Sequence, residues 1–227
     1  MGSPLIVALD IDHKSALELA NKIDPKDCKV KVGSELFTAS GPKIIKELKN
    51  LGFDIFLDLK FHDIPNTVSK AVEKAIEMDI WMLNVHSLGG KAMLKAAYQA
   101  KEKASIKPLL IGVTILTSLD DKSFRQVGFE REIKDQVLLL ADLCKEEGLN
   151  GVVCSPNELS LLRKNLDKDF LLVTPGIRSR SVEKHDQKRT SSITEAIQKG
   201  ANYVVIGREI TTDIDPNEKI KKILETV

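Results

Sequence analysis

The sequence predicts a single-domain (β/α)8 TIM barrel spanning residues 1–227, and three observations support this fold class. Eight short β-rich runs alternate with helical patterns from one end of the chain to the other. Alternating βα units are typical of a parallel sheet covered by helices. The length of 227 residues suits one barrel, since such barrels often take about 200 to 250 residues.

The predicted strands are short apolar runs bounded by turn or helix signals. They are Leu5 to Leu9, Cys28 to Val32, Ile55 to Leu59, Trp81 to Val85, Leu109 to Leu116, Gly151 to Cys154, Phe170 to Thr174 and Tyr203 to Ile206. Eight is the number of parallel strands that closes a barrel of this kind.

The segments between the strands repeat apolar residues at the spacing of one helix face. Two clear cases are Ala16, Leu17, Ala20 and Ile23, and Val68, Ala71, Val72, Ala75 and Ile76. Asp12 and Pro65 mark expected helix starts, and Gly52, Gly148 and Gly200 stand where helix C-caps are expected.

Composition narrows the choice of partners and compartment. The 34 basic and 33 acidic residues leave a net charge of +1, which gives no general reason to expect a nucleic acid or an anionic membrane as partner.

The apolar segment before Asp10 is too short for a secretory signal or a membrane span, so we expect a cytoplasmic protein. Cys28, Cys144 and Cys154 lie far apart and predict reduced, buried thiols rather than disulfides or a zinc site.

Polar residues gather where the predicted strands end, which is the active face of such barrels. The residues at these ends, most of them polar, are in chain order Asp10, Lys31, Asp58, Lys60, Asp63, His86, Thr117, Ser118, Ser155, Pro175, Gly176, Gly207 and Arg208.

Asp58 and Lys60 are two residues apart, so strand alternation predicts that both point into the barrel mouth. Buried charges are costly unless they are paired, so with Lys31 and Asp10 they are expected to form a mutually compensating array. The alternative is an ordinary surface ion pair.

The ends of the last two predicted strands suit phosphate. Gly207 with Arg208, and Gly176 with Arg178, combine close backbone approach with a guanidinium fork. Arg208 could instead pair only with neighbouring acids.

The polar segment from Gly176 to Arg189 is predicted to be a loop that covers the substrate, or alternatively a solvated variable loop.

No pattern for a metal or a nucleophile is evident. His86 stands alone at a strand end, where a structural role is more common than catalysis. His13, His62 and His185 share no ligand spacing, and neither HExxH nor GxSxG occurs. We therefore expect no metal and no organic cofactor.

The run from Asp58 to Thr67, DLKFHDIPNT, resembles the DxKxxDIPNT signature of the orotidine 5'-phosphate decarboxylase family. Matching segments follow in order along essentially the whole chain: LIVALD at Asp10, KVG at Lys31, NVH at His86, LTS at Thr117, TPGIR at Arg178, DQ at Gln187 and VIGR at Arg208.

This resemblance implies conversion of orotidine 5'-monophosphate to uridine 5'-monophosphate and CO2, without a metal or cofactor. Lys60 would protonate C6, with nearby carboxylates favouring its charged form. Asp58 would lie beside the substrate carboxylate, and Lys31 and Asp10 would bind the ribose hydroxyls. Thr117 and Ser118 would meet the pyrimidine. Gln187 would bridge base and phosphate, while Arg178, Arg208 and the Gly207 amide would serve the phosphate end.

The resemblance also implies a homodimer, in which Asp63 and Thr67 reach the site of the other subunit. Ile64, between them in the motif, is expected to line the substrate site. Two departures from the family pattern stand out: Ser87-Leu88 replaces a small pair, and Glu209 replaces a common proline. We expect Glu209 to face solvent.

Two other functions remain open at this point. A hexulose-phosphate synthase shares an Asp-x-Lys-x-x-Asp core but uses magnesium, so a chelator separates it from the decarboxylase. A catalytically silent barrel that only binds a nucleotide would bind uridine monophosphate without turning over the orotidylate.

Overall fold

The computed structural model describes residues 2–177 and 192–227. Within them, all eight predicted strands are present and pair in parallel as a closed barrel in the order of the chain. The strands are β1 (Leu5–Ala8), β2 (Lys29–Gly33), β3 (Ile55–Phe61), β4 (Met82–His86), β5 (Leu109–Val113), β6 (Gly151–Val153), β7 (Leu171–Thr174) and β8 (Tyr203–Ile206). The predicted (β/α)8 fold is confirmed.

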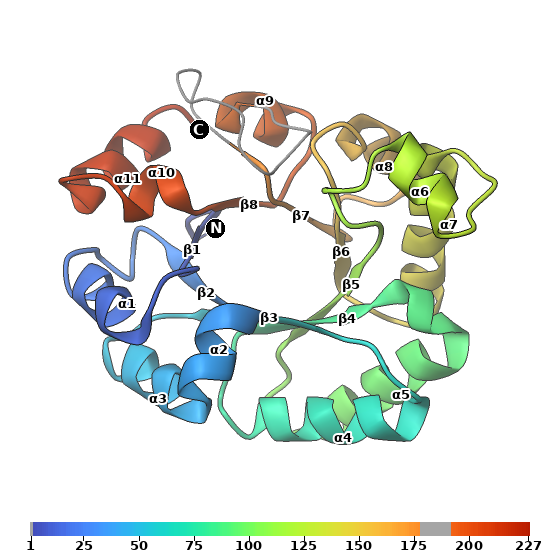
Figure 1. The fold of residues 1–227 in the computed structure, drawn as a ribbon, viewed down its shortest axis with the longest axis horizontal. Helices are drawn as coiled ribbons and strands as arrows, with labels where there is room; N and C mark the ends of the chain where they lie inside the picture. The colour runs from blue at the N-terminus through green and yellow to red at the C-terminus, as the bar shows by residue number, and fades with distance from the viewer. Residues whose placement is uncertain (1, 178–191) are drawn as a thin grey trace.

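Helices form a ring around the strands (Figure 1). They are α1 (His13–Ala20), α2 (Ser34–Ser40), α3 (Pro42–Asn50), α4 (Pro65–Ile76), α5 (Gly90–Glu102), α6 (Asp121–Gln126), α7 (Ile133–Glu146), α8 (Leu159–Asn165), α9 (Ile193–Gln198), α10 (Arg208–Thr211) and α11 (Pro216–Leu224), with a 3-10 turn at Ser87–Gly89. None of the helices in the described ranges is long and apolar enough to span a membrane.

Local sequence signals set the helix ends as predicted. The Asp12 side chain accepts the Ser15 N–H at the start of α1, and Pro65 opens α4. The three predicted C-cap glycines all adopt positive φ angles: Gly52, Gly148 and Gly200. A residue without Cβ reaches that conformation at no steric cost, so the chain can turn sharply back towards the next strand.

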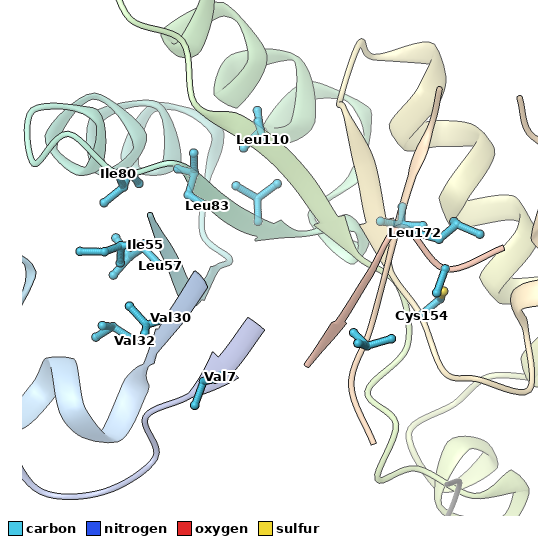
Figure 2. Packing of buried hydrophobic residues seen from close by; sticks show 14 of the residues in the cluster. Val7, Val30, Val32, Ile55, Leu57, Ile80, Leu83, Leu110, Cys154 and Leu172 are labelled. Carbon is cyan, nitrogen blue, oxygen red and sulfur yellow. The ribbon is translucent and has the colours of Figure 1, made fainter. Parts of the chain in front are cut away.

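The outward faces of the strands and the inward faces of the helices form one large apolar layer. Figure 2 shows the outward-facing strand side chains Val7, Val30, Val32, Ile55 and Leu57 among buried neighbours. Each such fully buried aliphatic side chain contributes about 1.5 to 3 kcal/mol relative to exposure. Because these residues alternate with inward-facing ones, this layer also fixes which side chains enter the barrel.

The barrel interior holds a second, smaller apolar cluster: Ile6, Ala8, Phe56, Met82, Ile111, Val173 and Val205. At the amino ends of the strands, Lys29 lies over the rings of Trp81 (5.0 Å) and Tyr203 (5.4 Å). These side chains fill the barrel interior towards the amino ends of the strands. Polar groups that point inward at the carboxyl ends therefore lie directly above an apolar layer.

Strand β5 ends earlier than predicted. It stops at Val113, whereas the apolar run continues to Leu116. The Thr114 hydroxyl donates to the carbonyl of Val153, and Thr117 and Ser118 lie in a turn beyond the strand. Apolarity alone did not mark this end, because Ile115 is buried without belonging to the sheet.

The three cysteines, Cys28, Cys144 and Cys154, are free and buried, as predicted. Burial raises the pKa of Cys28 and of Cys144 to about 12. Thiols held in their neutral form are poor nucleophiles, so all three behave as small apolar side chains.

Candidate active site

Four charged side chains meet at the carboxyl ends of β1, β2 and β3. The Nζ of Lys31 lies 2.8 Å from Asp10 Oδ1 and 3.3 Å from Asp58 Oδ2. The Nζ of Lys60 lies 2.7 Å from Asp58 Oδ1. Asp10, Lys31, Asp58 and Lys60 thus form a chain of alternating charges, which we call the charged array, as the strand spacing predicts.

Burial increases along the array towards its centre. The exposed fraction of the side chain is 55% for Asp10 but only 10% for Lys31 and 13% for Asp58. Burial alone would lower the pKa of Lys31, but the carboxylates of Asp58 and Asp10 outweigh it, and the net pKa is raised. Burial likewise tends to raise the pKa of Asp58, yet Lys31 and Lys60 bring it below its ordinary value. Both central groups are therefore held in their charged forms near neutral pH.

A β-bulge aims Lys60 at the array. Leu57 pairs with Leu83 on β4, but the next pairing joins Phe61 to Val85, so β3 has extra residues at this point. Lys60 itself has φ +52°, a left-handed conformation that is rare for a residue with a side chain. Simple alternation predicted correctly that Asp58 and Lys60 share a face, but the bulge, and not a regular strand, sets the direction of Lys60.

Asn84, which sequence reasoning did not select, completes the array from β4. Its side chain is fully buried. Its Nδ2 donates to Asp58 Oδ1 at 2.7 Å, and its Oδ1 accepts the backbone N–H of Lys60 at 2.7 Å. Alternation along β4 could have signalled it, because an uncharged polar residue faces inward between Met82 and His86.

Gly33 leaves room for the array at the end of β2. A Cβ at this position would lie 2.9 Å from Lys31 Nζ and 3.0 Å from Asp10 Oδ1. A side chain at Gly33 would therefore push Lys31 or Asp10 out of place, whereas the backbone conformation of the strand would accept one.

Gly207 and Arg208 follow β8, which is paired with β1 in the barrel. Gly207 is the N-cap of the short helix α10, and Arg208 is its first residue, with an exposed side chain. Both lie next to Asp10 in the order of strands around the mouth.

The expectation that Glu209 faces solvent is wrong. Its side chain is only 6% exposed, and its Oε1 lies 3.0 Å from the Nζ of Lys219 on α11. Helix α11 folds back over α10 and covers this carboxylate, which the sequence could not show because the two residues are ten positions apart.

Asp63, Ile64 and Thr67 are exposed at the end of β3 and the start of α4. Asp63 Oδ1 accepts the N–H of Ile64 at 2.6 Å. The described contacts within this chain do not bring these residues into the charged array. Arg178 and Gln187, and with them the predicted covering loop up to Arg189, lie outside the described residues.

His86 is electrically neutral near pH 7. Its ring stacks on His62 with centroids 5.2 Å apart. Burial, together with the charges of His62 and Lys60, lowers the pKa of His86 to about 4. Next to it, Ser87 is buried and donates to the Val113 carbonyl, whereas Leu88 is exposed. This environment suits a packing role for His86.

Among residues 2–177 and 192–227, no group of three or more His, Cys, Asp or Glu side chains is arranged to hold a metal ion. The array instead consists of two ammonium and two carboxylate groups that neutralise one another.

Comparison with known proteins identifies the family. The profile of the "Orotidine 5'-phosphate decarboxylase / HUMPS family" matches residues 3–223. The chain belongs to this family. Its description joins two names, so membership by itself does not choose between two activities.

Curated members of the family resemble the chain closely over nearly its full length. Orotidine 5'-phosphate decarboxylase of Vibrio campbellii is 48% identical over 225 residues, which is 98% of this chain and 97% of the relative. The enzyme of the same name from Nitrosococcus oceani is 49% identical over 222 residues, covering 97% and 96% of the two chains.

Two solved structures share the fold. Orotidine 5'-phosphate decarboxylase from Lactobacillus acidophilus has a TM-score of 0.89 and 38% identity, covering 99% of this chain and 98% of that one. An uncharacterized conserved protein from Geobacillus kaustophilus has a TM-score of 0.87 and 34% identity, covering 98% and 99%.

Proposed function

We propose that the protein decarboxylates orotidine 5'-monophosphate to uridine 5'-monophosphate and CO2, in the synthesis of pyrimidine nucleotides. The observation that carries this proposal is the charged array, in which the Lys60 ammonium contacts Asp58 2.7 Å away at the mouth of the barrel. The names of the curated relatives at 48 to 49% identity point to the same reaction.

The order of groups around the mouth matches the order of groups in a nucleotide. Gly207 and Arg208 follow β8, which neighbours β1; β1 neighbours β2, and β2 neighbours β3. A phosphate at Arg208 would be followed by a ribose at Asp10 and Lys31, and then by the pyrimidine at Lys60. Thr117 and Ser118, beyond β5, would meet the far side of the base.

Lys60 is the general acid of the proposed reaction. Loss of CO2 leaves an electron pair on C6, and a fixed ammonium group stabilises it and then supplies the proton. The C6–carboxylate bond breaks, CO2 departs, and a proton from Lys60 Nζ forms the new C6–H bond.

Asp58 would stand beside the substrate carboxylate. Its lowered pKa keeps it ionised at neutral pH. Two carboxylates held together raise the energy of the bound substrate, and this repulsion disappears as CO2 leaves. Lys31, between Asp58 and Asp10, would hold both carboxylates in place and hydrogen-bond a ribose hydroxyl.

Binding energy from the phosphate end would align the reacting carbon. Arg208 and the Gly207 amide would hold the phosphate, with Arg178 and Gln187 contributed by the loop that follows β7. Contacts far from the reacting atoms can supply the energy for closure and alignment.

The active protein would be a two-fold homodimer in the cytoplasm. Asp63 and Thr67 are exposed, so they are free to reach a partner's site, and Ile64 beside them is 66% exposed. The large exposed side chain of Ile64 would be covered in such an interface.

A decarboxylation assay tests the proposal. Purified protein with a metal chelator present should release CO2 and convert the ultraviolet spectrum of the orotate ring into that of uridine monophosphate. Lys60→Ala should lower kcat by about 1,000-fold or more, because it removes both the charge and the proton donor. Calorimetry should still show binding of uridine monophosphate to this variant.

Lys29→Ala is the matched control, because Lys29 is also an inward lysine of the barrel but lies at the opposite mouth. It should keep kcat near that of the unmodified protein. Turnover that depends on magnesium, or nucleotide binding without any turnover, would overturn the proposal in favour of the synthase or the silent barrel.

A further inference from the structure

We propose that Asn84 is a positioning residue whose carboxamide holds the Lys60 backbone and the Asp58 carboxylate in their reactive arrangement before the substrate binds. This inference rests on the proposed function, because it assigns to Asn84 an effect on the same chemical step.

One side chain joins both catalytic groups. Asn84 Oδ1 accepts the backbone N–H of Lys60 at 2.7 Å, and Nδ2 donates to Asp58 Oδ1 at 2.7 Å. The same Asp58 oxygen accepts Lys60 Nζ at 2.7 Å. The backbone of Lys60, its ammonium group and the Asp58 carboxylate are thus linked through a closed set of three hydrogen bonds.

The backbone of Lys60 needs such support. Its φ of +52° lies in the left-handed region, which crowds the Cβ of any residue other than glycine. A conformation of this kind persists only where surrounding contacts impose it. The bulge between Leu57 and Phe61 takes this part of β3 out of register with β4, and the Asn84 side chain reaches the Lys60 N–H at that point.

Burial makes the arrangement specific. Asn84 is 0% exposed, so its amide cannot exchange these partners for bulk water. A buried polar group that loses its partner is costly, and rotation of the amide would break both hydrogen bonds at once. The carboxamide oxygen accepts from the Lys60 N–H, and its NH2 group donates to the ionised Asp58.

Two substitutions separate the two halves of this role. Asn84→Ala removes both hydrogen bonds. Asn84→Asp keeps the acceptor for Lys60, and its acid form can still donate to Asp58, whereas its ionised form places a second negative charge there. Among the described residues, Asn84 contacts Asp58 and Lys60 on β3. Lys31 on β2 and Asp10 after β1 belong to the same network of charges, and His86, which stacks on His62, is two residues further along β4.

Asn202→Ala is the matched control. Asn202 Oδ1 accepts the Leu172 backbone N–H at 2.8 Å, so it too supports a strand through its amide, but it lies at the amino end of β8. It should lower the melting temperature without changing kcat.

Steady-state assays with orotidine monophosphate provide the test. Asn84→Ala should lower kcat about 100-fold, as small misplacements of reacting groups do, while KM changes less than about threefold. Asn84→Asp should show a new limb in its pH–rate profile, with activity falling as the added carboxyl ionises at rising pH. Crystals of Asn84→Ala should show Lys60 outside the left-handed region.

The inference is overturned if Asn84→Ala keeps kcat within about threefold of the unmodified protein, or if Asn202→Ala loses as much. It is also overturned if Lys60 stays left-handed in the Ala variant. If Asn84→Ala does not fold, Asn84→Asp takes its place in the test. The inference is then overturned if Asn84→Asp has the kcat and the pH–rate profile of the unmodified protein. Absence of turnover in the unmodified protein overturns the proposed function instead. In that case the inference is tested only by the backbone conformation of Lys60 in crystals of the Asn84→Ala variant.

Discussion

Single residues define the chemistry at the mouth of this barrel. Lys31 and Asp58 are nearly buried, and each has opposite charges within 3.3 Å. Removing one member would leave its neighbour charged and uncompensated, which is far more costly than losing a surface ion pair. This mutual dependence explains why the four charges of the array occur together.

His86 gives a pH-dependent contribution to stability whose sign follows from its pKa of about 4, below the ordinary 6.5. Between these two values the unfolded chain binds a proton that the folded protein excludes. The free energy of unfolding should therefore fall as the pH decreases from 6.5 to about 4, and this loss is absent above 6.5. His86→Gln should make the melting temperature less dependent on pH in that window.

Scanning calorimetry across this pH range checks the prediction. Above pH 7 the curves for the variant and the unmodified protein should run parallel, which serves as an internal control. Asp58 does not affect this comparison. Its pKa is lowered, so its contribution to the free energy of unfolding is lost only at pH values below its ordinary pKa of 3.8. Parallel curves throughout the window would show that His86 is not the group responsible.

The sequence predicted the charged residues of the site but not how they are held. Asp58 and Lys60 stand out because charges in an apolar strand require partners. Asn84 carries no charge, and the left-handed backbone of Lys60 arises from the register shift between β3 and β4. Alternation along β4 places Asn84 inward, but its contacts with Asp58 and Lys60 depend on tertiary structure and cannot be derived from the sequence.

At the scale of elements, the order of strands and helices followed from local patterns, while some ends did not. Strand β5 stops at Val113 although the apolar run continues to Leu116, because burial in a loop produces the same pattern as burial in a sheet. Glu209 was wrongly expected in solvent, since only the packing of α11 onto α10 covers it.

The Glu209–Lys219 pair should stabilise the helix that presents Arg208. Lys219→Met removes the ammonium next to a carboxylate that is 6% exposed, and should cost about 1 to 3 kcal/mol of unfolding free energy. Because α10 begins with Arg208, KM for the phosphorylated substrate should rise while kcat changes little.

Denaturant titration and steady-state kinetics measure these effects. Lys222→Met is the matched control, since Lys222 lies on the same helix and its 3.8 Å contact with Glu218 is solvent-exposed; it should change stability little. The double variant with Glu209→Gln should recover part of the loss. Equal effects of Lys219→Met and Lys222→Met would contradict a special role for the buried pair.

At the scale of the whole molecule, the closed barrel brings together residues that are far apart in the sequence. Asp10 and Arg208 are separated by almost the entire chain, yet they follow paired strands, β1 and β8. The count of eight strands predicted this closure. The proposed homodimer is different, because the folding of one chain leaves Asp63 and Thr67 exposed, and they would meet a site only if a second chain were present.

In the proposed reaction, the Lys60 ammonium is held against C6 of a pyrimidine nucleotide. A crystal structure with bound uridine 5'-monophosphate tests it most directly. We predict the nucleotide at the carboxyl-end mouth, with its phosphate at Arg208 and with Lys60 Nζ within about 3.5 Å of C6. A nucleotide bound at the opposite mouth, or Lys60 turned away from the base into bulk water, would show that Lys60 does not protonate C6.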